Sequence, residues 1–185
     1  WIAFVSDRSG AENLWVARPD GSQARQVTFG QDDTVLVSPA WAADGRALFV
    51  SRYRPDLNNY ELWRYGLDGT ETLLTPVKPT PGAPRSAWRS TLGAASSPDG
   101  RFLYVARRVG GLSFDEADAW TIVRRDLSTG SETSVIFGSG GRGADHESFF
   151  RPQVSPDGGR LAYATRRDGH TELRLRDLAT GEDRP

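Results

Sequence analysis

The sequence predicts an all-β protein, a partial β-propeller of four-stranded antiparallel blades that supplies about three to four blades of a larger ring. Two observations lead to this prediction. One pattern of apolar blocks and turns recurs four times along the 185 residues, and the chain contains 20 Gly and 11 Pro residues. This density of helix-breaking residues is too high for long helices, and their regular placement is unlike that of a disordered chain.

The clearest recurring feature is an Asp-Gly pair followed within two residues by Arg and then by an apolar block. Asp-Gly between apolar runs is a strong hairpin signal, because the tight turn needs a positive φ that Gly adopts without a Cβ clash. We therefore predict a structural turn at each pair. The turn residues are Asp44, Gly45, Asp99, Gly100, Asp157 and Gly158.

The block after each turn is apolar at successive positions, which predicts a strand covered on both faces. These blocks lie at 47–50, 102–105 and 161–164, with a further copy at 2–5. The next strand alternates, as Leu173 and Leu175 do with Arg174 and Arg176, so we expect it nearer to solvent. This combination is typical of a blade stacked between neighbours. A single sandwich or barrel is the alternative, but it does not explain why the whole register recurs.

The repeat divides the chain into four blades of one propeller fragment. Residues 1–37 are expected to form a partial blade lacking its inner strand, since no Asp-Gly precedes the block at 2–5. Residues 38–93 form a second blade and a Pro-rich loop, and residues 94–151 a third blade and a Gly-rich loop. Residues 152–185 form a fourth, truncated blade. The chain contains no Met, and we expect it to be part of a larger propeller ring.

Composition excludes several classes of partner. The 23 basic and 24 acidic residues are interleaved and give a net charge of −1, which argues against a nucleic-acid partner. The longest uncharged run, residues 34–43, is too short to span a bilayer, so no membrane span is expected. The absence of Cys excludes thiol chemistry but does not fix the compartment.

The sequence predicts no catalytic, cofactor-binding or metal-binding residues in this segment. It has no GxSxG motif, and its two histidines are His146 and His170. The cluster at 145–147 is more typical of a solvated loop than of a metal site. A GxGxxG match at 138–143 lacks room for the helix that would bind a pyrophosphate. Whether the protein is an enzyme therefore stays open.

Three long connections between blades, at 29–37, 76–93 and 138–151, are expected to emerge on one face. Long loops that carry aromatic and charged side chains on a rigid scaffold are common binding sites. A possible interaction face therefore comprises Trp88, Asp145, His146, Glu147 and Arg151. An equal alternative packs Trp88 beneath its own loop.

The motifs SPDG, ELWRYGLDG and LLT resemble the TolB-type propeller repeat. Pro39, Trp41, Asp44 and Gly45 match the opening of that repeat. A second match consists of Pro152, Ser155, Pro156, Asp157 and Gly158. The stretches ADHESFFRPQVSPDG and TELRLRDLATGEDRP are similar to the N-terminal propeller of large bacterial amidohydrolases, which join such repeats to a metal-dependent hydrolase barrel. Similar repeats occur in prolyl oligopeptidase-like peptidases, in tricorn-like proteases and in TolB proteins.

This resemblance implies a non-catalytic propeller module of a larger hydrolase, an amidohydrolase rather than a peptidase, that acts in docking, substrate gating or protein interaction. Its partner would be the catalytic domain of the same polypeptide or another protein, and no cofactor is expected in this segment. The alternatives are a stand-alone protein-binding adaptor and the propeller of a prolyl oligopeptidase-like or tricorn-like peptidase. The resemblance also implies a periplasmic or secreted location.

Overall fold

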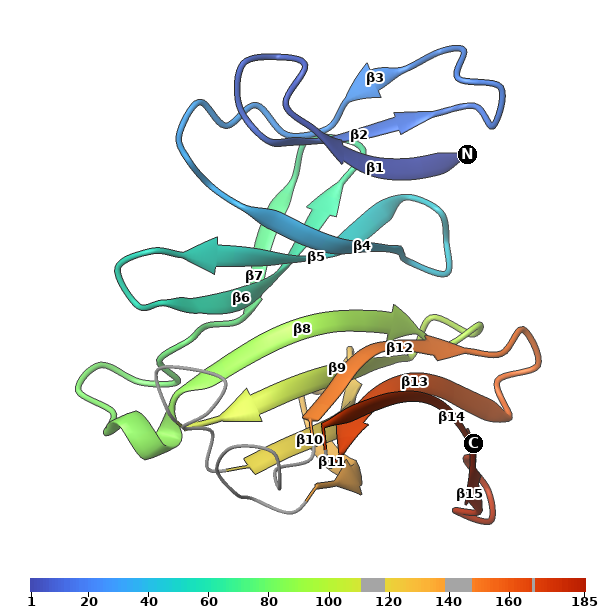
Figure 1. Cartoon of the computed structure of the whole chain (residues 1–185). Helices are drawn as coiled ribbons and strands as arrows, with labels where there is room; N and C mark the ends of the chain where they lie inside the picture. Colours follow the sequence, from blue (N-terminus) through green and yellow to red (C-terminus); the bar gives the residue numbers. More distant parts are fainter. Residues whose placement is uncertain (111–118, 139–147, 168) are drawn as a thin grey trace.

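The computed structural model describes residues 1–110, 119–138, 148–167 and 169–185. They form four antiparallel sheets that follow one another along the chain and stack face to face as an open fan (Figure 1). In this described part, the only helical element is a short 3-10 turn, η1 (Arg85–Ala87). The predicted all-β class and partial propeller are confirmed.

Each sheet is a meander in which strands adjacent in sequence are adjacent in space. The first sheet contains β1 (Ile2–Ser6), β2 (Asn13–Ala17) and β3 (Arg25–Gln26). The second contains β4 (Leu36–Trp41), β5 (Ala47–Arg54), β6 (Asn59–Gly66) and β7 (Glu71–Thr75). The third contains β8 (Arg89–Ser96), β9 (Phe102–Val109), β10 (Ala119–Asp126) and β11 (Glu132–Phe137). The fourth contains β12 (Ser148–Val154), β13 (Arg160–Arg167), β14 (His170–Asp177) and β15 (Asp183–Arg184).

The inner strands β4, β8 and β12 begin earlier than the expected loops end. Residues 36–37, 89–93 and 148–151 belong to strands, although the sequence analysis placed them in the connections. The difference arises because Pro and Gly, which usually indicate loops, also occur at bulges within strands. In this fold Pro39, Gly93 and Pro152 lie within strands, at places where the strand pairing is interrupted.

Those interruptions are bulges that occur at the same place in all three inner strands. In each bulge one residue adopts a left-handed backbone conformation, and the bulge bends the strand. The φ angles are 55° at Ser38, 103° at Gly93 and 47° at Arg151. Only glycine adopts this region without strain. Two of the three repeats therefore hold a strained residue here.

Burial of the apolar blocks depends on where each sheet lies in the stack. Ala47, Leu48, Phe49 and Val50 of β5 are at most 2% exposed, as expected for a strand covered on both faces. In the first sheet, by contrast, Ile2 is 45% exposed. The terminal sheets pack against one described neighbour each, so only one of their faces is covered by another sheet.

In β14 of the fourth sheet, the covered face carries arginine and the exposed face carries leucine, the reverse of the usual arrangement. Leu173 is 69% exposed, whereas the side chain of Arg174 is only 19% exposed. Arg174 pairs across the strands with Tyr163, on the face that packs against the third sheet, while Leu173 pairs with Ala164 on the opposite face. The alternation of apolar and basic residues is present, but the neighbouring sheet decides which face is covered.

Three apolar clusters join the successive sheets, one at each interface. Leu14 and Val16 pack against Leu48 and Val50 between the first and second sheets. Full burial of a side chain of this size contributes about 1.5–3 kcal/mol. The second interface contains Phe49, Leu62, Ala94, Leu103, Val105 and Val123. The third contains Tyr104, Ala106, Trp120, Ile122, Ile136, Phe149, Leu161 and Tyr163.

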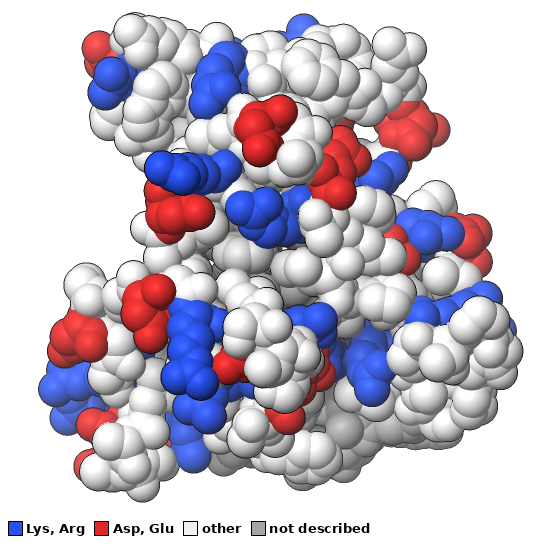
Figure 2. All heavy atoms as spheres, turned by 180° about the vertical axis from the view of Figure 1, so that it is seen from behind, with Lys and Arg blue, Asp and Glu red and all other residues white. Residues whose placement is uncertain are grey.

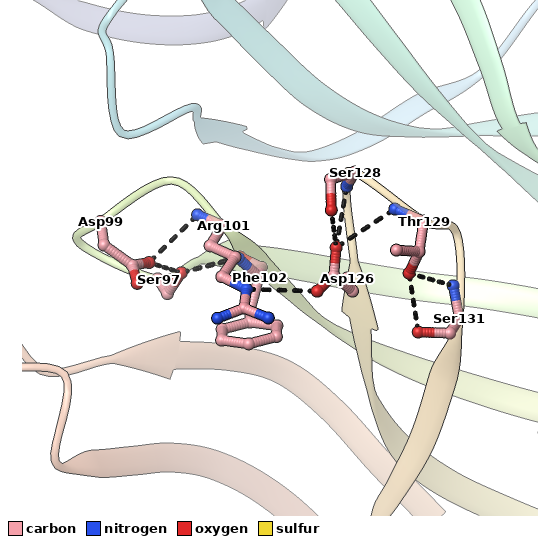
Figure 3. A network of polar contacts seen from close by, with 8 residues as sticks. All are labelled: Ser97, Asp99, Arg101, Phe102, Asp126, Ser128, Thr129 and Ser131. Carbon is pink, nitrogen blue, oxygen red and sulfur yellow. Dashed lines mark hydrogen bonds and ion pairs between the residues drawn. The ribbon is translucent and has the colours of Figure 1, made fainter.

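A polar network fixes the turn between β8 and β9 (Figure 3). The Ser97 hydroxyl donates to Asp99 at 2.5 Å and accepts a hydrogen bond from the backbone N–H of Phe102 at 2.9 Å. Asp99 also accepts the backbone N–H of Arg101 at 3.0 Å. Ser155 and Asp157 make the same contacts in the fourth sheet. The second sheet has Ala42 at the serine position and retains only the contact from Arg46 to Asp44.

The same network extends to the turn between β10 and β11. Arg101 Nε donates to Asp126 at 3.2 Å, and Asp126 also accepts the backbone N–H groups of Ser128 and Thr129. Hydrogen bonds from the side chain and backbone of Ser128 lower the pKa of Asp126 to about 2, although burial opposes this shift. The ionised carboxylate therefore joins two turns that are separated by 25 residues.

A second ion-pair network crosses the third sheet. Arg107, which is 3% exposed, donates to the two oxygens of Glu132 at 2.6 and 2.8 Å, and Arg125 donates to the same carboxylate at 3.0 Å. Burial alone would raise the pKa of Glu132, but hydrogen bonds from the two arginines and their charges lower it to about 2. The ionised form is thus strongly favoured in the folded protein.

Replacing Glu132 by Gln is expected to destabilise the protein by about 2 kcal/mol near pH 7, because the buried Arg107 loses its counter-charge. The loss is smaller than for a fully buried pair, because Glu132 is partly exposed and solvent screens its charge. The lowered pKa contributes stability that is present above the ordinary value of about 4.5 and is lost as the pH falls towards 2. The gap between wild type and E132Q should therefore close between about pH 5 and pH 2.

Urea unfolding at a series of pH values measures that gap. Glu71 is the matched control, since it occupies the equivalent place at the start of β7, is exposed and pairs with no arginine among the described residues. E71Q should change the free energy of unfolding by less than about 0.5 kcal/mol. A constant gap between wild type and E132Q across this pH range would contradict the proposed role of the carboxylate.

Replacing Gly93 by Ala should be more damaging than the same change at an open glycine. A Cβ at Gly93 would lie 3.2 Å from Cα and 3.4 Å from N of Arg151, in addition to the strain at φ 103°. We expect G93A to cost about 2–3 kcal/mol and G82A about 1 kcal/mol, because Gly82 also has a positive φ but open space around it. Thermal unfolding compares the two variants, and equal losses would show that the close approach is unimportant.

Candidate functional site

The three bulges converge at the centre of the fan. Strand β8 lies between β4 and β12, so the inner strands of three sheets run side by side (Figure 1). A Cβ built on Gly93 would lie 3.6 Å from Cβ of Ser38 and 3.2 Å from Cα of Arg151. Ser38 of β4 and Gly93 of β8 are 55 positions apart in the sequence, and Gly93 and Arg151 of β12 are 58 apart. The three residues nevertheless meet at the centre of the fan.

A cavity of about 320 Å³ opens at this point. The cavity contains one charged residue, and none of its lining residues is acidic. Its lining residues are Ser38, Pro39, Ala40, Gly93, Ala94, Arg151 and Gln153. The backbone N–H of Gly93 donates to Ser51 Oγ at 3.2 Å, which fixes the central bulge to the neighbouring sheet. The lining is therefore polar and carries a net positive charge.

Arg151 is the distinctive residue of this cavity. It is exposed, and its side chain makes no hydrogen bond or ion pair in the described structure. Other arginines of the chain do form such contacts, as Arg54 does with Asp56 and Arg107 with Glu132. The left-handed conformation of Arg151 also costs about 1 kcal/mol or more that a glycine would avoid.

Trp88 lies away from this cavity, next to η1. It is half-buried, and its Nε1–H donates to the backbone oxygen of Ala83 at 3.1 Å. Lys78 Nζ and Arg85 Cζ lie 4.9 and 5.4 Å from its ring centroid, within the range of cation–π attraction. The structure thus packs Trp88 within its own loop and surrounds it with two cations.

The predicted interaction residues therefore fall in different places. Asp145, His146 and Glu147 lie outside the described residues, Trp88 belongs to the loop before β8, and Arg151 belongs to a strand. Sequence reasoning did not associate Ser38 and Gly93 with Arg151. The available signal was their spacing, since each lies six positions before the Asp of an Asp-Gly pair.

A second candidate surface lies where the outer strands lead into the long connections. Phe29 and Phe137 are 73% and 72% exposed, and both follow a buried residue at the same place in the repeat, Thr28 and Ile136 respectively. We call the end of the fan that carries these connections the long-loop end. It appears at the left of Figure 1, where η1 is visible. The short Asp-Gly turns between β4 and β5 and between β8 and β9 lie at the opposite end.

The remaining surface gives little sign of a charged or metal-binding site. Basic and acidic side chains are interspersed over the face shown in Figure 2. Within the described ranges, no group of three or more His, Asp and Glu side chains is placed to hold a metal ion. No helix in this part of the chain is long and apolar enough to cross a membrane.

Comparison with curated proteins finds a relative over almost the whole chain. A protein TolB homolog of Chlorobium luteolum is 26% identical over 186 residues, which cover 99% of this chain and 35% of the relative. The chain thus spans about a third of the length of this curated relative. No known protein-family profile matches the chain.

Solved structures show the same fold. A TolB of Agrobacterium tumefaciens aligns with a TM-score of 0.68 at 17% identity, covering 98% of this chain and 59% of that one. A puromycin-hydrolyzing peptidase of Mycobacterium tuberculosis aligns with a TM-score of 0.59 at 16% identity, covering 94% and 24%. An oligogalacturonate lyase in complex with manganese aligns with a TM-score of 0.55 at 17% identity, covering 99% and 61%. Identities this low establish the fold rather than the activity, and the chain therefore has a TolB-like β-propeller fold.

Proposed function

We propose that this propeller is a non-catalytic binding module of a longer protein and that its long-loop end docks onto a protein surface. The observation that supports docking is the pair of exposed phenylalanines, Phe29 and Phe137, at equivalent places in two sheets. Two large aromatic side chains that lie open at the same end of a rigid scaffold are suited to a partner that buries them.

The exposed aromatic side chains give this surface a source of binding free energy. Burial of a phenylalanine stabilises a complex by about 1.5–3 kcal/mol before the costs of association are subtracted. Aromatic and arginine side chains are also enriched among the residues that dominate interface energies. Trp88, with Lys78 and Arg85 beside it, adds a basic aromatic feature to the connection that enters β8.

The first candidate for the partner is the catalytic domain of the same polypeptide, in a metal-dependent amidohydrolase. The similarity of residues 144–158 and 171–185 to amidohydrolase propellers supports this candidate. For this candidate we propose that the protein is periplasmic or secreted. The likeness in fold to a puromycin-hydrolyzing peptidase supports a peptidase parent as an alternative within the hydrolases.

A stand-alone adaptor that binds a separate protein is the second candidate function. The similarity to a TolB homolog over 99% of the chain supports it. The two candidates differ in whether the long-loop end is covered within the same polypeptide or is free to capture another chain.

The docking proposal predicts that Phe29→Ser combined with Phe137→Ser exposes the long-loop end of the longer protein. Hydrogen exchange should show faster exchange at residues 76–88 in this double variant, because the contact that protects them is weakened. Leu73→Ser is the matched control, since Leu73 is 39% exposed on the outer strand β7. Unchanged exchange in the double variant would exclude docking within the polypeptide.

Further measurements separate the candidate functions. Amide hydrolysis by the intact protein that is lost on chelation of divalent metal and restored by its return would support the amidohydrolase. Capture of a separate partner chain by wild type, but not by the double phenylalanine variant, would support the adaptor. An intact protein that hydrolyses no amide and has no metal-binding sequence beside the propeller would exclude the amidohydrolase.

A further inference from the structure

We infer that the axial cavity bounded by the three inner-strand bulges is a binding site for a small organic carboxylate, held by Arg151. This site is independent of the docking surface, because it is built from β4, β8 and β12 rather than from the long connections. The equivalent bulge residues of three repeats, Ser38, Gly93 and Arg151, lie together at this cavity.

The first argument is the chemistry of the lining. Arg151 supplies the only charge among the lining residues, and the described structure gives its guanidinium no carboxylate partner. An arginine presents a planar fork of donors that matches a carboxylate with two parallel hydrogen bonds. Ser38 and Gln153 add neutral hydrogen-bonding side chains to the same cavity. One guanidinium beside neutral hydrogen-bonding side chains suits one carboxylate group of a ligand.

The second argument is the backbone strain that keeps Arg151 in place. The fold accepts glycine at this bulge position, as Gly93 shows in the central repeat. A glycine in the fourth sheet would relieve the strain of the left-handed conformation, which a side chain such as arginine adopts at a cost. An unpaired charge at a strained position contributes nothing to folding that the structure shows. Binding of a ligand to the guanidinium would explain why arginine occupies this position.

The third argument is size. The cavity measures about 320 Å³, which lies at the lower end of the range for small-molecule sites. Pro39, Ala40 and Ala94 line part of it and leave space for a short carbon skeleton, because none has a long side chain. The site therefore fits a short organic acid.

The test titrates the whole chain with succinate at constant ionic strength and follows binding by calorimetry and by the NMR signals of the arginine side chains. We expect saturable binding, with a dissociation constant in the millimolar range or tighter. Succinamide has the same skeleton without charge and should not bind measurably. Inorganic phosphate should bind more weakly than succinate, because it has no carbon skeleton to contact Pro39, Ala40 and Ala94.

Two variants assign the binding to Arg151. R151Q and R151G should each weaken succinate binding at least tenfold, whereas R46Q should leave it unchanged, since Arg46 is an exposed arginine at the turn between β4 and β5. R151G should also raise the midpoint of thermal unfolding by about 2–4 °C, because glycine relieves the strain. Higher stability together with lost binding separates a binding role from a structural one.

Several outcomes would overturn the proposal. One is the absence of saturable succinate binding to wild type. Others are that R151Q binds succinate as tightly as wild type does, or that wild type binds succinamide as tightly as succinate. Tighter binding of phosphate than of succinate would overturn the carboxylate assignment. A lower unfolding midpoint in R151G would show that the arginine is kept for stability.

Discussion

The sheets of this protein bury their apolar side chains where a neighbouring sheet covers them. A four-stranded meander has two apolar faces, and the second strand of each repeat is apolar at successive positions for that reason. In β5 both faces are covered, and all four residues of the apolar block are buried. The interface clusters and the axial cavity depend on this stacking, because it brings equivalent parts of the repeat together.

Stacking around an axis crowds the inner strands, and the bulges are the local response. Strands β4, β8 and β12 would otherwise continue straight past one another, but each bends at the same position. The approach is close enough that a single methyl group on Gly93 would contact the backbone of Arg151. The axial cavity is therefore a product of the repeat, whereas its charge comes from the one repeat that carries arginine.

The terminal sheets show how the fold treats a face that no described neighbour covers. In the first sheet Arg8 lies 5.0 Å from the ring centroids of both Phe4 and Trp15 and partly covers them. In the fourth sheet Leu173 remains largely exposed. These faces are suited to packing against another sheet of the same kind.

The sequence by itself determined the fold class, the number of repeats and the positions of the hairpin turns, because these depend on local chemistry. An Asp-Gly pair forms its turn through contacts within a few residues, as the hydrogen bond from Arg101 to Asp99 shows. The identity of Arg151 as a candidate was also visible. Its companions Ser38 and Gly93 share its spacing from the next turn, but spacing alone does not say that they meet.

The tertiary structure decided what depends on neighbours. It placed Arg151 in a strand rather than a loop, because a bulge accommodates Pro152 within β12. It decided that Leu173 faces outward and Arg174 inward, since only one face of the fourth sheet meets the third. It also packed Trp88 against its own loop. Each of these outcomes rests on contacts between segments far apart in the chain, which residue types and periodicity do not encode locally.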